Sequence, residues 1–280
     1  MKLTLLGAGG KMGCRITDSL KGNPDYVVSH VEIDPRGIAR LAERGVSVRP
    51  RDAALREADI VVLAIPDTAI GKVTRECVPQ VRPGAIVIGL DPAAAFAGIL
   101  PPRPDITYFI CHPTHPPLFN DEIDPKARVD WFGGTAKQSV VCALFQGPEE
   151  HYAVGERLAR VMFQPIIDAY RITIEQMAIL EPALVETFTS TLVAAMKEAF
   201  DEAVRMGVPR DAATAFLMGH LRIQFAVTFG YADFPFSDGA KYAIAQARDV
   251  IFKPDWKANV MNLSSIRKTV AEITKATQAG

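Results

Sequence analysis

Several features that mark particular classes of protein are scarce in this sequence. The 280 residues carry a formal net charge of −1 without a long basic run, which argues against nucleic acid or an anionic membrane as the main partner. No apolar run reaches the roughly 20 residues that span a bilayer, and the short N-terminal apolar run lacks the basic leader of a signal peptide. We therefore expect a cytoplasmic protein, long enough for two modest domains.

Cysteine is also scarce, and its spacing does not indicate a metal or redox motif. The simplest interpretation is a set of buried free thiols. Cys111 is the exception because it adjoins His112, and a thiol nucleophile of the aldehyde-dehydrogenase type is an alternative there. The four cysteines are Cys14, Cys77, Cys111 and Cys142.

Glycine is concentrated near the N-terminus, where it forms a recognisable pattern. Gly7, Gly10 and Gly13 lie between the apolar run Leu3–Leu6 and the helically spaced segment Cys14–Leu20. This order predicts a strand, a tight turn and a helix whose first N–H groups can approach a diphosphate. The spacing fits Gly-x-x-Gly-x-x-Gly better than the commoner Gly-x-Gly-x-x-Gly.

A second strand, Val27–Val31, leads to Glu32, about twenty residues after the glycine turn, where an acid can accept from both ribose hydroxyls. The two signals together predict a dinucleotide site. The acid favours NAD because it repels a 2′-phosphate, while Arg36 leaves NADP open. The predicted cofactor-binding residues are Gly7, Gly10, Lys11, Met12, Gly13, Glu32 and, after a third strand, Ile65 and Pro66.

Strand-like runs alternate with helical segments in the first half and then give way to long helical periods. This alternation predicts an α/β, Rossmann-type, doubly wound parallel sheet over residues 1–174. Residues 175–280 should form a smaller, all-helical domain that closes the cleft over a small substrate and pairs with a second subunit as a homodimer. The predicted strands are Leu3–Leu6, Val27–Val31, Ile60–Ala64, Ala85–Ile88, Thr107–Ile110 and Val140–Phe145, with one more extended segment at Pro165–Ile174.

A second concentrated signal is the histidine- and proline-rich segment that follows the strand Thr107–Ile110. His112 and His115 are separated by two residues and stiffened by three prolines. Imidazoles at a strand end can serve as metal ligands or as a proton acceptor, and local packing or capping is the alternative. We expect this segment to form a loop over the ligand crevice.

Two carboxylates occur at the predicted domain junction in an otherwise apolar stretch. Glu181 precedes a proline, which predicts a helix beginning at Pro182, and Glu186 lies about 140° further round that helix. A solvated pair is one interpretation. The other is that Glu181 and His112 hold a divalent ion, for which zinc, manganese and magnesium are candidates. Late in the chain, Lys241 is a candidate clamp for a substrate carboxylate.

At this point the sequence resembles a known family. The first half looks like the nucleotide domain of 6-phosphogluconate, β-hydroxyacid and prephenate dehydrogenases and ketol-acid reductoisomerases. The segments Glu175–Thr187 and Ile251–Trp256 are similar to the phosphogluconate-dehydrogenase-like C-terminal domain. Over nearly its whole length the chain resembles the D-apionate oxidoisomerases of bacterial apiose breakdown.

The resemblance implies oxidation of a hydroxyl of a branched sugar acid by NAD, with a metal-assisted α-ketol rearrangement of D-apionate to 3-oxo-isoapionate. From the histidine segment and the junction carboxylates we expect His112 and Glu181 to hold this metal and Glu186 or His115 to accept the proton. β-Hydroxyacid dehydrogenases carry a catalytic lysine and an asparagine where this chain has Glu181–Glu186, which contains neither. A carboxylate cannot replace an ammonium group, but it can hold a metal that does the same electrostatic work.

Two alternatives remain open from the sequence. One is an NAD(P)-dependent β-hydroxyacid dehydrogenase, with or without decarboxylation, because it shares the fold. The other is a non-catalytic NAD-binding sensor, which would bind the nucleotide without reducing it.

Overall fold

The computed structural model describes residues 1–275, apart from the side chains of Asp67, Ile273 and Lys275. The described chain divides into two compact units. The first comprises Met1–Leu180 together with the segment from Arg267 onward, and the second comprises Glu181–Ile266. The domain boundary after residue 174 stays a prediction.

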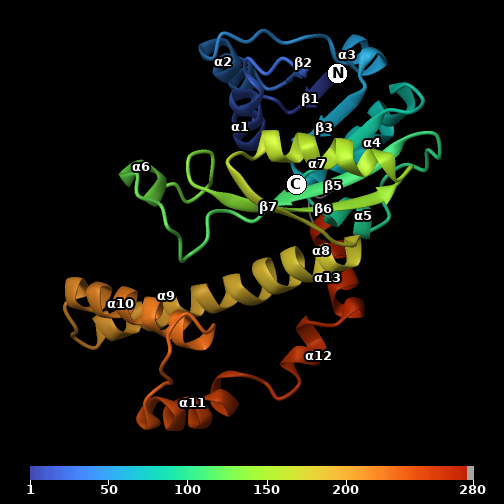
Figure 1. The fold of residues 1–280 in the computed structure, drawn as a ribbon. Coiled ribbons are helices and arrows are strands. Elements are labelled where there is room, and N and C mark those ends of the chain that lie inside the picture. Colours follow the sequence, from blue (N-terminus) through green and yellow to red (C-terminus); the bar gives the residue numbers. More distant parts are fainter. Residues whose placement is uncertain (276–280) are drawn as a thin grey trace. The chain divides into compact units, whose positions relative to one another are not determined.

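The first unit is built on one seven-stranded sheet with the strand order β2-β1-β3-β4-β5-β6-β7 (Figure 1). The strands from β1 to β5 are mutually parallel, β6 runs antiparallel to β5, and β7 runs parallel to β6. The chain order reverses between β1 and β3, and ligands of such sheets bind at the carboxyl ends of the strands beside this reversal. The strands are β1 (Lys2–Leu6), β2 (Val27–Val31), β3 (Ile60–Leu63), β4 (Ile86–Gly89), β5 (Thr107–Pro113), β6 (Gln138–Gln146) and β7 (Ile166–Arg171).

Helices cover both faces of the sheet, and each face has its own core. Successive strand residues point to opposite faces, so Leu5 packs in the core that includes Ile16 and Leu158, and Leu6 packs in the core that includes Leu55. The helices of this unit are α1 (Lys11–Leu20), α2 (Pro35–Glu43), α3 (Arg51–Glu57), α4 (Asp67–Cys77), η1 (Val78–Gln80), α5 (Ala93–Phe96), α6 (Pro125–Arg128), α7 (Glu150–Met162), α8 (Ile174–Ala178) and α13 (Leu263–Lys275), the last belonging to this unit from Arg267.

The predicted Rossmann-type fold is confirmed by this arrangement. Strands β3 and β4 are buried at every residue, as expected where helices cover both faces of a parallel sheet. The sheet is mostly rather than wholly parallel, because β6 runs antiparallel to β5 and β7 follows the direction of β6. A parallel neighbour requires a crossover packed on the sheet, whereas the chain between β5 and β6 forms only the four-residue helix α6 and re-enters beside Pro113, opposite Val140.

Strand β5 is longer than predicted, and this changes the setting of the histidine segment. The sequence predicted that the strand ends at Ile110 and that a loop begins at Cys111. Instead, pairing with β6 extends β5 to Pro113, with His112 opposite Val141. His112 is therefore held by the sheet, and the loop begins after Pro113.

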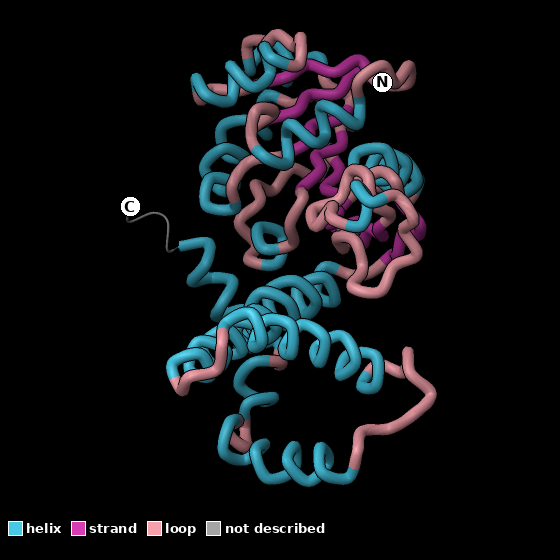
Figure 2. The backbone as a smooth tube through the Cα atoms, turned by 90° about the vertical axis from the view of Figure 1, so that its left-hand side faces the viewer, coloured by secondary structure: helices cyan, strands magenta, loops and turns pink. Residues whose placement is uncertain are grey.

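The second unit contains helices joined by loops, and the strands described in this chain all belong to the first unit (Figure 2). The predicted all-helical character of this half is confirmed. Its elements are η2 (Ile179–Thr189, entering this unit at Glu181), α9 (Ser190–Arg205), α10 (Arg210–Thr228), α11 (Asp238–Ile251), α12 (Trp256–Val260) and the first turn of α13.

The helix predicted to begin at Pro182 begins earlier, at Ile174. Thr173 starts it through a capping box, in which its hydroxyl accepts from the Gln176 N–H and the Gln176 side chain accepts from the Thr173 N–H. Pro182 then lies inside the π-helical segment η2. Proline lacks the N–H of the α-helical ladder and clashes with the carbonyl four residues earlier, which accounts for the wider turn here.

The helical run Ile174–Arg205 passes a length and composition test for a membrane-spanning segment, with 22% of its apolar window buried. Such a result is weak evidence for a membrane, because core helices of globular proteins pass the same test. The run is also interrupted by the carboxylates of Glu181 and Glu186.

Candidate active site

The glycine turn lies between β1 and α1, at the carboxyl edge of the sheet. Gly7 has a φ of 71°, and a Cβ there would lie 2.3 Å from the carbonyl oxygen of Ala64. Gly13 packs the helix against the turn, since a Cβ there would lie 2.1 Å from the carbonyl oxygen of Gly7. Gly10 occupies the N-cap of α1 without a capping side chain. The first-turn N–H groups of α1 therefore point toward an incoming anion.

A pocket of about 280 Å³ lies beside this turn and combines residues from the ends of β1, β2 and β3. Of the predicted cofactor-binding residues, Gly7, Gly10, Glu32, Ile65 and Pro66 line it, and Lys11, Met12 and Gly13 do not. Two arginines that the sequence analysis did not select also line it. The lining residues are Leu6, Gly7, Gly10, Val31, Glu32, Ile33, Asp34, Arg40, Arg51, Ala64, Ile65, Pro66, Ala69 and Val73.

Glu32 ends β2 with its carboxylate folded over the turn. It accepts from the backbone N–H groups of Gly9 at 2.8 Å, Ile33 at 2.8 Å and Asp34 at 2.9 Å. Ionised carboxylates have about four acceptor positions, so capacity remains for a hydroxyl. Gly37 makes room for this side chain, because a Cβ there would lie 2.7 Å from the Glu32 side chain. Gly37 was missed by the sequence analysis.

A group of potential metal ligands lies at the next strand ends. Asp91, His112 and Glu181 each offer one ligand atom, and these atoms all lie within 4.8 Å of one another. Strand register explains the first two: Gly89 pairs with Ile110 on parallel strands, so Asp91 and His112 lie the same two residues beyond that pair. Glu181 comes from η2.

The hydrogen bond of His112 decides which ring nitrogen is available. Its Nδ1 lies 2.8 Å from the carbonyl oxygen of Leu90. A carbonyl only accepts, so Nδ1 carries the proton and Nε2 keeps its lone pair for a metal. Asp91 is fixed as well, because its Oδ1 accepts from the N–H of Ala93, the first residue of α5, at 2.7 Å. Asp91 was missed by the sequence analysis, although it follows a predicted strand by three residues.

His115 lies in the loop after β5 with a φ of 61°, a strained value for a residue other than glycine. Its Nδ1 donates to the carbonyl oxygen of Phe132 at 3.1 Å, and its ring centroid lies 6.4 Å from that of His112. The remaining predicted residues lie in the second unit. Glu186 follows Glu181 by five residues in η2, and Lys241 is on α11, where its ammonium pairs with Asp238 at 3.2 Å.

The thiol-nucleophile alternative for Cys111 is wrong. The side chain is completely buried in β5, opposite Cys142 of β6. Burial raises the pKa of the Cys111 thiol well above its ordinary value, and the neighbouring Cys142 acts in the same direction. A neutral thiol out of reach of solvent cannot act as a nucleophile. The other three cysteines are also buried and free, as predicted.

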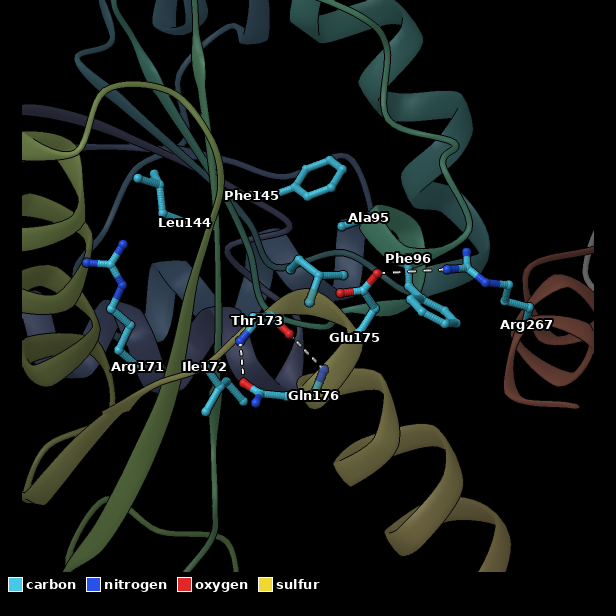
Figure 3. Close-up of a pocket in the computed structure, with 11 residues that line it drawn as sticks. Ala95, Phe96, Leu144, Phe145, Arg171, Ile172, Thr173, Glu175, Gln176 and Arg267 are labelled. Atoms are coloured by element: carbon cyan, nitrogen blue, oxygen red, sulfur yellow. Dashed lines mark hydrogen bonds and ion pairs between the residues drawn. The ribbon is translucent and has the colours of Figure 1, made fainter. Parts of the chain in front are cut away.

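A separate pocket of about 680 Å³ lies in the first unit near the start of α8 (Figure 3). Arg267 of α13 points into it, with its guanidinium 3.9 Å from the carboxylate of Glu175 and 4.6 Å from the ring centroid of Phe96. Phe96 ends α5, which begins two residues after Asp91, and Glu175 lies in α8, which leads into η2 and Glu181. Arg267 therefore contacts the two helices that adjoin the carboxylates of the metal group.

Comparison with known proteins gives matches over both units. Residues 120–274 match the C-terminal domain of decarboxylating phosphogluconate dehydrogenase, and residues 2–91 match the family described as NADP oxidoreductase, coenzyme F420-dependent. A D-apionate oxidoisomerase from Cupriavidus necator is 49% identical over 275 residues, which cover 98% of this chain and 99% of that protein. A D-apionate oxidoisomerase from Rhizobium rhizogenes is 48% identical over 274 residues, covering 97% and 99%.

One solved structure matches this chain with similar sequence identity and coverage. It is the crystal structure of a semialdehyde dehydrogenase NAD-binding protein from Cupriavidus necator in complex with calcium and NAD. It shares 49% sequence identity with this chain at a TM-score of 0.95, and the match covers 98% of this chain and 99% of that one. The described fold is thus shared over its full length with a protein that binds a nucleotide and a divalent cation.

Proposed function

The chain belongs to the D-apionate oxidoisomerase family, and we propose that it oxidises D-apionate with NAD and rearranges the product to 3-oxo-isoapionate. The resemblance recognised in the sequence is thereby confirmed, and the alternative of a non-catalytic sensor is set aside. The observation that carries the proposal is the group of Asp91, His112 and Glu181, which supplies ligands for a cation in a chain that has no lysine between Glu181 and Glu186.

NAD and a divalent cation are the cofactors. The first turn of α1 offers backbone N–H groups to a diphosphate, and Glu32 offers an acceptor to the adenosine ribose. Both observations fit the NAD bound by the C. necator relative. When bound, NAD accepts a hydride, and the cation polarises a carbonyl and lowers the pKa of hydroxyl groups beside it.

We propose zinc, manganese or magnesium as the working cation, although the relative's crystal holds calcium. Calcium prefers six to eight oxygen ligands. One of the three candidate ligands here is the Nε2 nitrogen of His112, fixed by the Nδ1 bond to Leu90. Imidazole suits zinc, whereas carboxylate and water ligands suit magnesium, manganese and calcium, so a mixed set of one nitrogen and two carboxylates favours zinc among the candidates.

The reaction needs a proton acceptor and a partner for the substrate carboxylate, and the remaining predicted residues are candidates for these roles. Carbon C2 loses a hydride to the nicotinamide, and the hydroxyl on C2 loses its proton to His115 or Glu186, which leaves a ketone at C2. The hydroxymethyl group then moves from C3 to C2 with its bonding electrons. The C3 hydroxyl loses its proton and becomes the ketone, while the C2 carbonyl oxygen gains a proton and becomes a hydroxyl. The carbon count is unchanged. Lys241 is our candidate for pairing with the substrate carboxylate.

We propose that the chain acts as a homodimer through its helical unit. Within Glu181–Ile266, which is described throughout, α9 and α11 bury no residue and α10 buries only Ala213. Helices of this length depend on packing an apolar face for stability. Large apolar side chains are instead exposed, among them Phe216 at 69%, Val250 at 86% and Ile251 at 69%. A cytoplasmic location stays a prediction.

The test is product analysis with purified, chelator-treated protein. NADH absorbance is followed with D-apionate, NAD and each of zinc, manganese, magnesium and calcium, and the product skeleton is identified by carbon-13 NMR. We expect NADH to form only with added metal. We expect the carbon-13 spectrum of the product to show all five substrate carbons in a rearranged skeleton. Carbon dioxide with a shortened skeleton would instead favour a decarboxylating β-hydroxyacid dehydrogenase.

The variants His112→Ala and Glu181→Ala complete the test. Both should abolish turnover while leaving NAD affinity, measured by fluorescence titration, within about twofold of the parent, because neither side chain lines the nucleotide pocket. Turnover at the parental rate in either variant without added metal would reject the metal role.

A further inference from the structure

Phe132 connects the nucleotide-binding helix to the histidine loop. It lies between α6 and β6, and its carbonyl oxygen accepts from two side chains: Arg15 Nη1 at 2.8 Å and His115 Nδ1 at 3.1 Å. Its ring receives the Lys11 ammonium 3.8 Å from the centroid and lies 5.5 Å from the ring of His115. One residue thus contacts the first two turns of α1 and the strained histidine.

Arg15 is an unusual residue to find buried, and its contacts explain its place. It is 9% exposed, and burial lowers the pKa of its guanidinium, against an opposing effect of the Asp130 charge. Besides Phe132, it donates from Nη2 to the carbonyl of Phe163 at 3.3 Å. Its Nε finds no partner among the described residues. Burying a guanidinium is costly, and here the buried group holds two backbone carbonyls in place.

The loop around Phe132 is shaped to receive this guanidinium. The carboxylate of Asp130 accepts from the N–H groups of Gly133, Thr135 and Ala136 at 2.8 to 3.0 Å. Gly133 has a φ of 91°, and a Cβ there would lie 2.8 Å from Arg15 Nη2. The loop therefore closes tightly on Arg15, and the position of the Phe132 carbonyl is set from α1.

His115 depends on that carbonyl for both its orientation and its tautomer. Because a carbonyl only accepts, the bond to Phe132 places the proton on Nδ1 and leaves the lone pair on Nε2. The φ of 61° at His115 is an uncommon backbone conformation that persists only where the surroundings maintain it. The Phe132 carbonyl and ring supply such surroundings on one side, and the ring of His112 lies on another.

We propose that Phe132, held in place by Arg15, is a positioning residue that keeps His115 in the Nδ1–H tautomer and aims its Nε2 at the substrate. The inference rests on the proposed function, in which His115 is one of the two candidate proton acceptors, and it selects His115 over Glu186. It also gives Lys11 and Arg15 a role at the site, since both contact the residue that holds the proton acceptor.

The first experiment reads the tautomer directly, without turnover. In protein labelled with nitrogen-15 histidine, long-range proton–nitrogen spectra should show His115 as a single Nδ1–H form. Arg15→Met removes the guanidinium while keeping an apolar chain of similar length, and it should shift His115 toward a mixture of tautomers. Arg15→Lys, whose ammonium lacks the planar fork that holds the Phe132 and Phe163 carbonyls together, serves if the Arg15→Met variant does not fold. An unchanged Nδ1–H signal in both variants would overturn the proposal.

The second experiment is a double-mutant cycle on kcat. Misplacing a reacting group by about 1 Å can cost about 100-fold, so Phe132→Leu should lower kcat by about 10- to 100-fold with NAD and metal affinities within about twofold of the parent. Phe132→Tyr should restore kcat, and Trp131→Leu, a neighbouring aromatic that is 79% exposed, is the matched control. In a His115→Ala background, Phe132→Leu should cause little further loss, because both act through the same imidazole.

The outcomes separate this inference from the function on which it rests. Additive losses in the cycle would overturn the positioning role while leaving His115 as the proton acceptor. Unchanged kcat in His115→Ala would reject His115 as the acceptor and with it this proposal, while the oxidoisomerase reaction would stand with Glu186 in that role. Absence of any D-apionate turnover in the parent protein would instead reject the proposed function.

Discussion

Asp91 provides the sharpest test of the metal group, because the structure and not the sequence brings it to the site. We expect Asp91→Asn to weaken binding of the cation while leaving the fold and the nucleotide site unchanged. The asparagine keeps an oxygen that can accept from Ala93 N–H, so the start of α5 is preserved. What it loses is one negative charge beside His112 and Glu181.

The magnitude follows from how closely the three ligand atoms are already placed. An ion equidistant from three atoms 4.8 Å apart would be about 2.8 Å from each, compared with zinc bonds of about 2.0 to 2.2 Å. Each ligand atom therefore has to move by less than about 1 Å, so the group is nearly formed. Removing an outer partner of a metal ligand costs about 10- to 100-fold in affinity. Removing a direct charged ligand should cost at least about 100-fold, or about 2.7 kcal/mol.

The assay is competition with a chromophoric chelator, using chelator-treated protein and zinc or manganese. The matched control is Asp25→Asn, an exposed aspartate that precedes β2 and therefore lies at the opposite edge of the sheet from Asp91. The control should bind metal with parental affinity, and both variants should bind NAD normally. A dissociation constant for Asp91→Asn within about twofold of the control would refute the reasoning, since a ligand cannot be removed without cost.

Three other perturbations test the fold and the assembly. Gly13→Ala should destabilise the protein by about 1 to 3 kcal/mol in urea unfolding, because its Cβ would meet the Gly7 carbonyl at 2.1 Å. Gly219→Ala in α10, whose Cβ would meet no described atom within 4 Å, should instead stabilise it by up to about 1 kcal/mol. A change of unfolding free energy in the same direction for both variants would contradict the packing argument. Burial raises the pKa of Cys142 from the ordinary thiol value of 9.0 to about 12, so the thiol loses its proton at lower pH in the unfolded chain than in the folded protein. The free energy of unfolding should therefore fall as the pH rises from 9.0 toward about 12. Cys142→Val should make this fall shallower, and a variant whose unfolding free energy falls as steeply as the parent's would contradict the role of Cys142. Val250→Glu should dissociate the proposed dimer in light scattering, whereas a dimeric variant would place the contact elsewhere.

The elements that could be predicted from the sequence are those specified by local patterns. The glycine turn needs only its own residues and the flanking strand and helix, and the observed φ of Gly7 follows from that turn. The buried parallel strands read as short apolar runs because both of their faces are covered. His112 was selected because it belongs to a histidine- and proline-rich segment after a predicted strand, and Glu181 because it is a carboxylate in an otherwise apolar stretch.

Asp91 could not be found in this way, because its role depends on strand register. In the sequence it reads as a turn residue before Pro92 and is 21 residues from His112. Only the pairing of Gly89 with Ile110 places the two at the same height on neighbouring strands. Register between strands is set by packing across the whole sheet and not by the residues of one segment.

The π-helical segment is the other feature that local rules could not supply, and it changes the relation between the two junction carboxylates. By the rules for α-helices, Pro182 indicates a first helical position and Glu181 and Glu186 lie about 140° apart. In η2, hydrogen bonds join residues five apart, so Glu186 follows Glu181 on the next turn of the same side. The helix had already been started by the capping box at Thr173, which forces Pro182 into its interior. The proline that seemed to mark a beginning is therefore the physical cause of the wider turn, and that turn aligns Glu186 with the metal-group carboxylate Glu181.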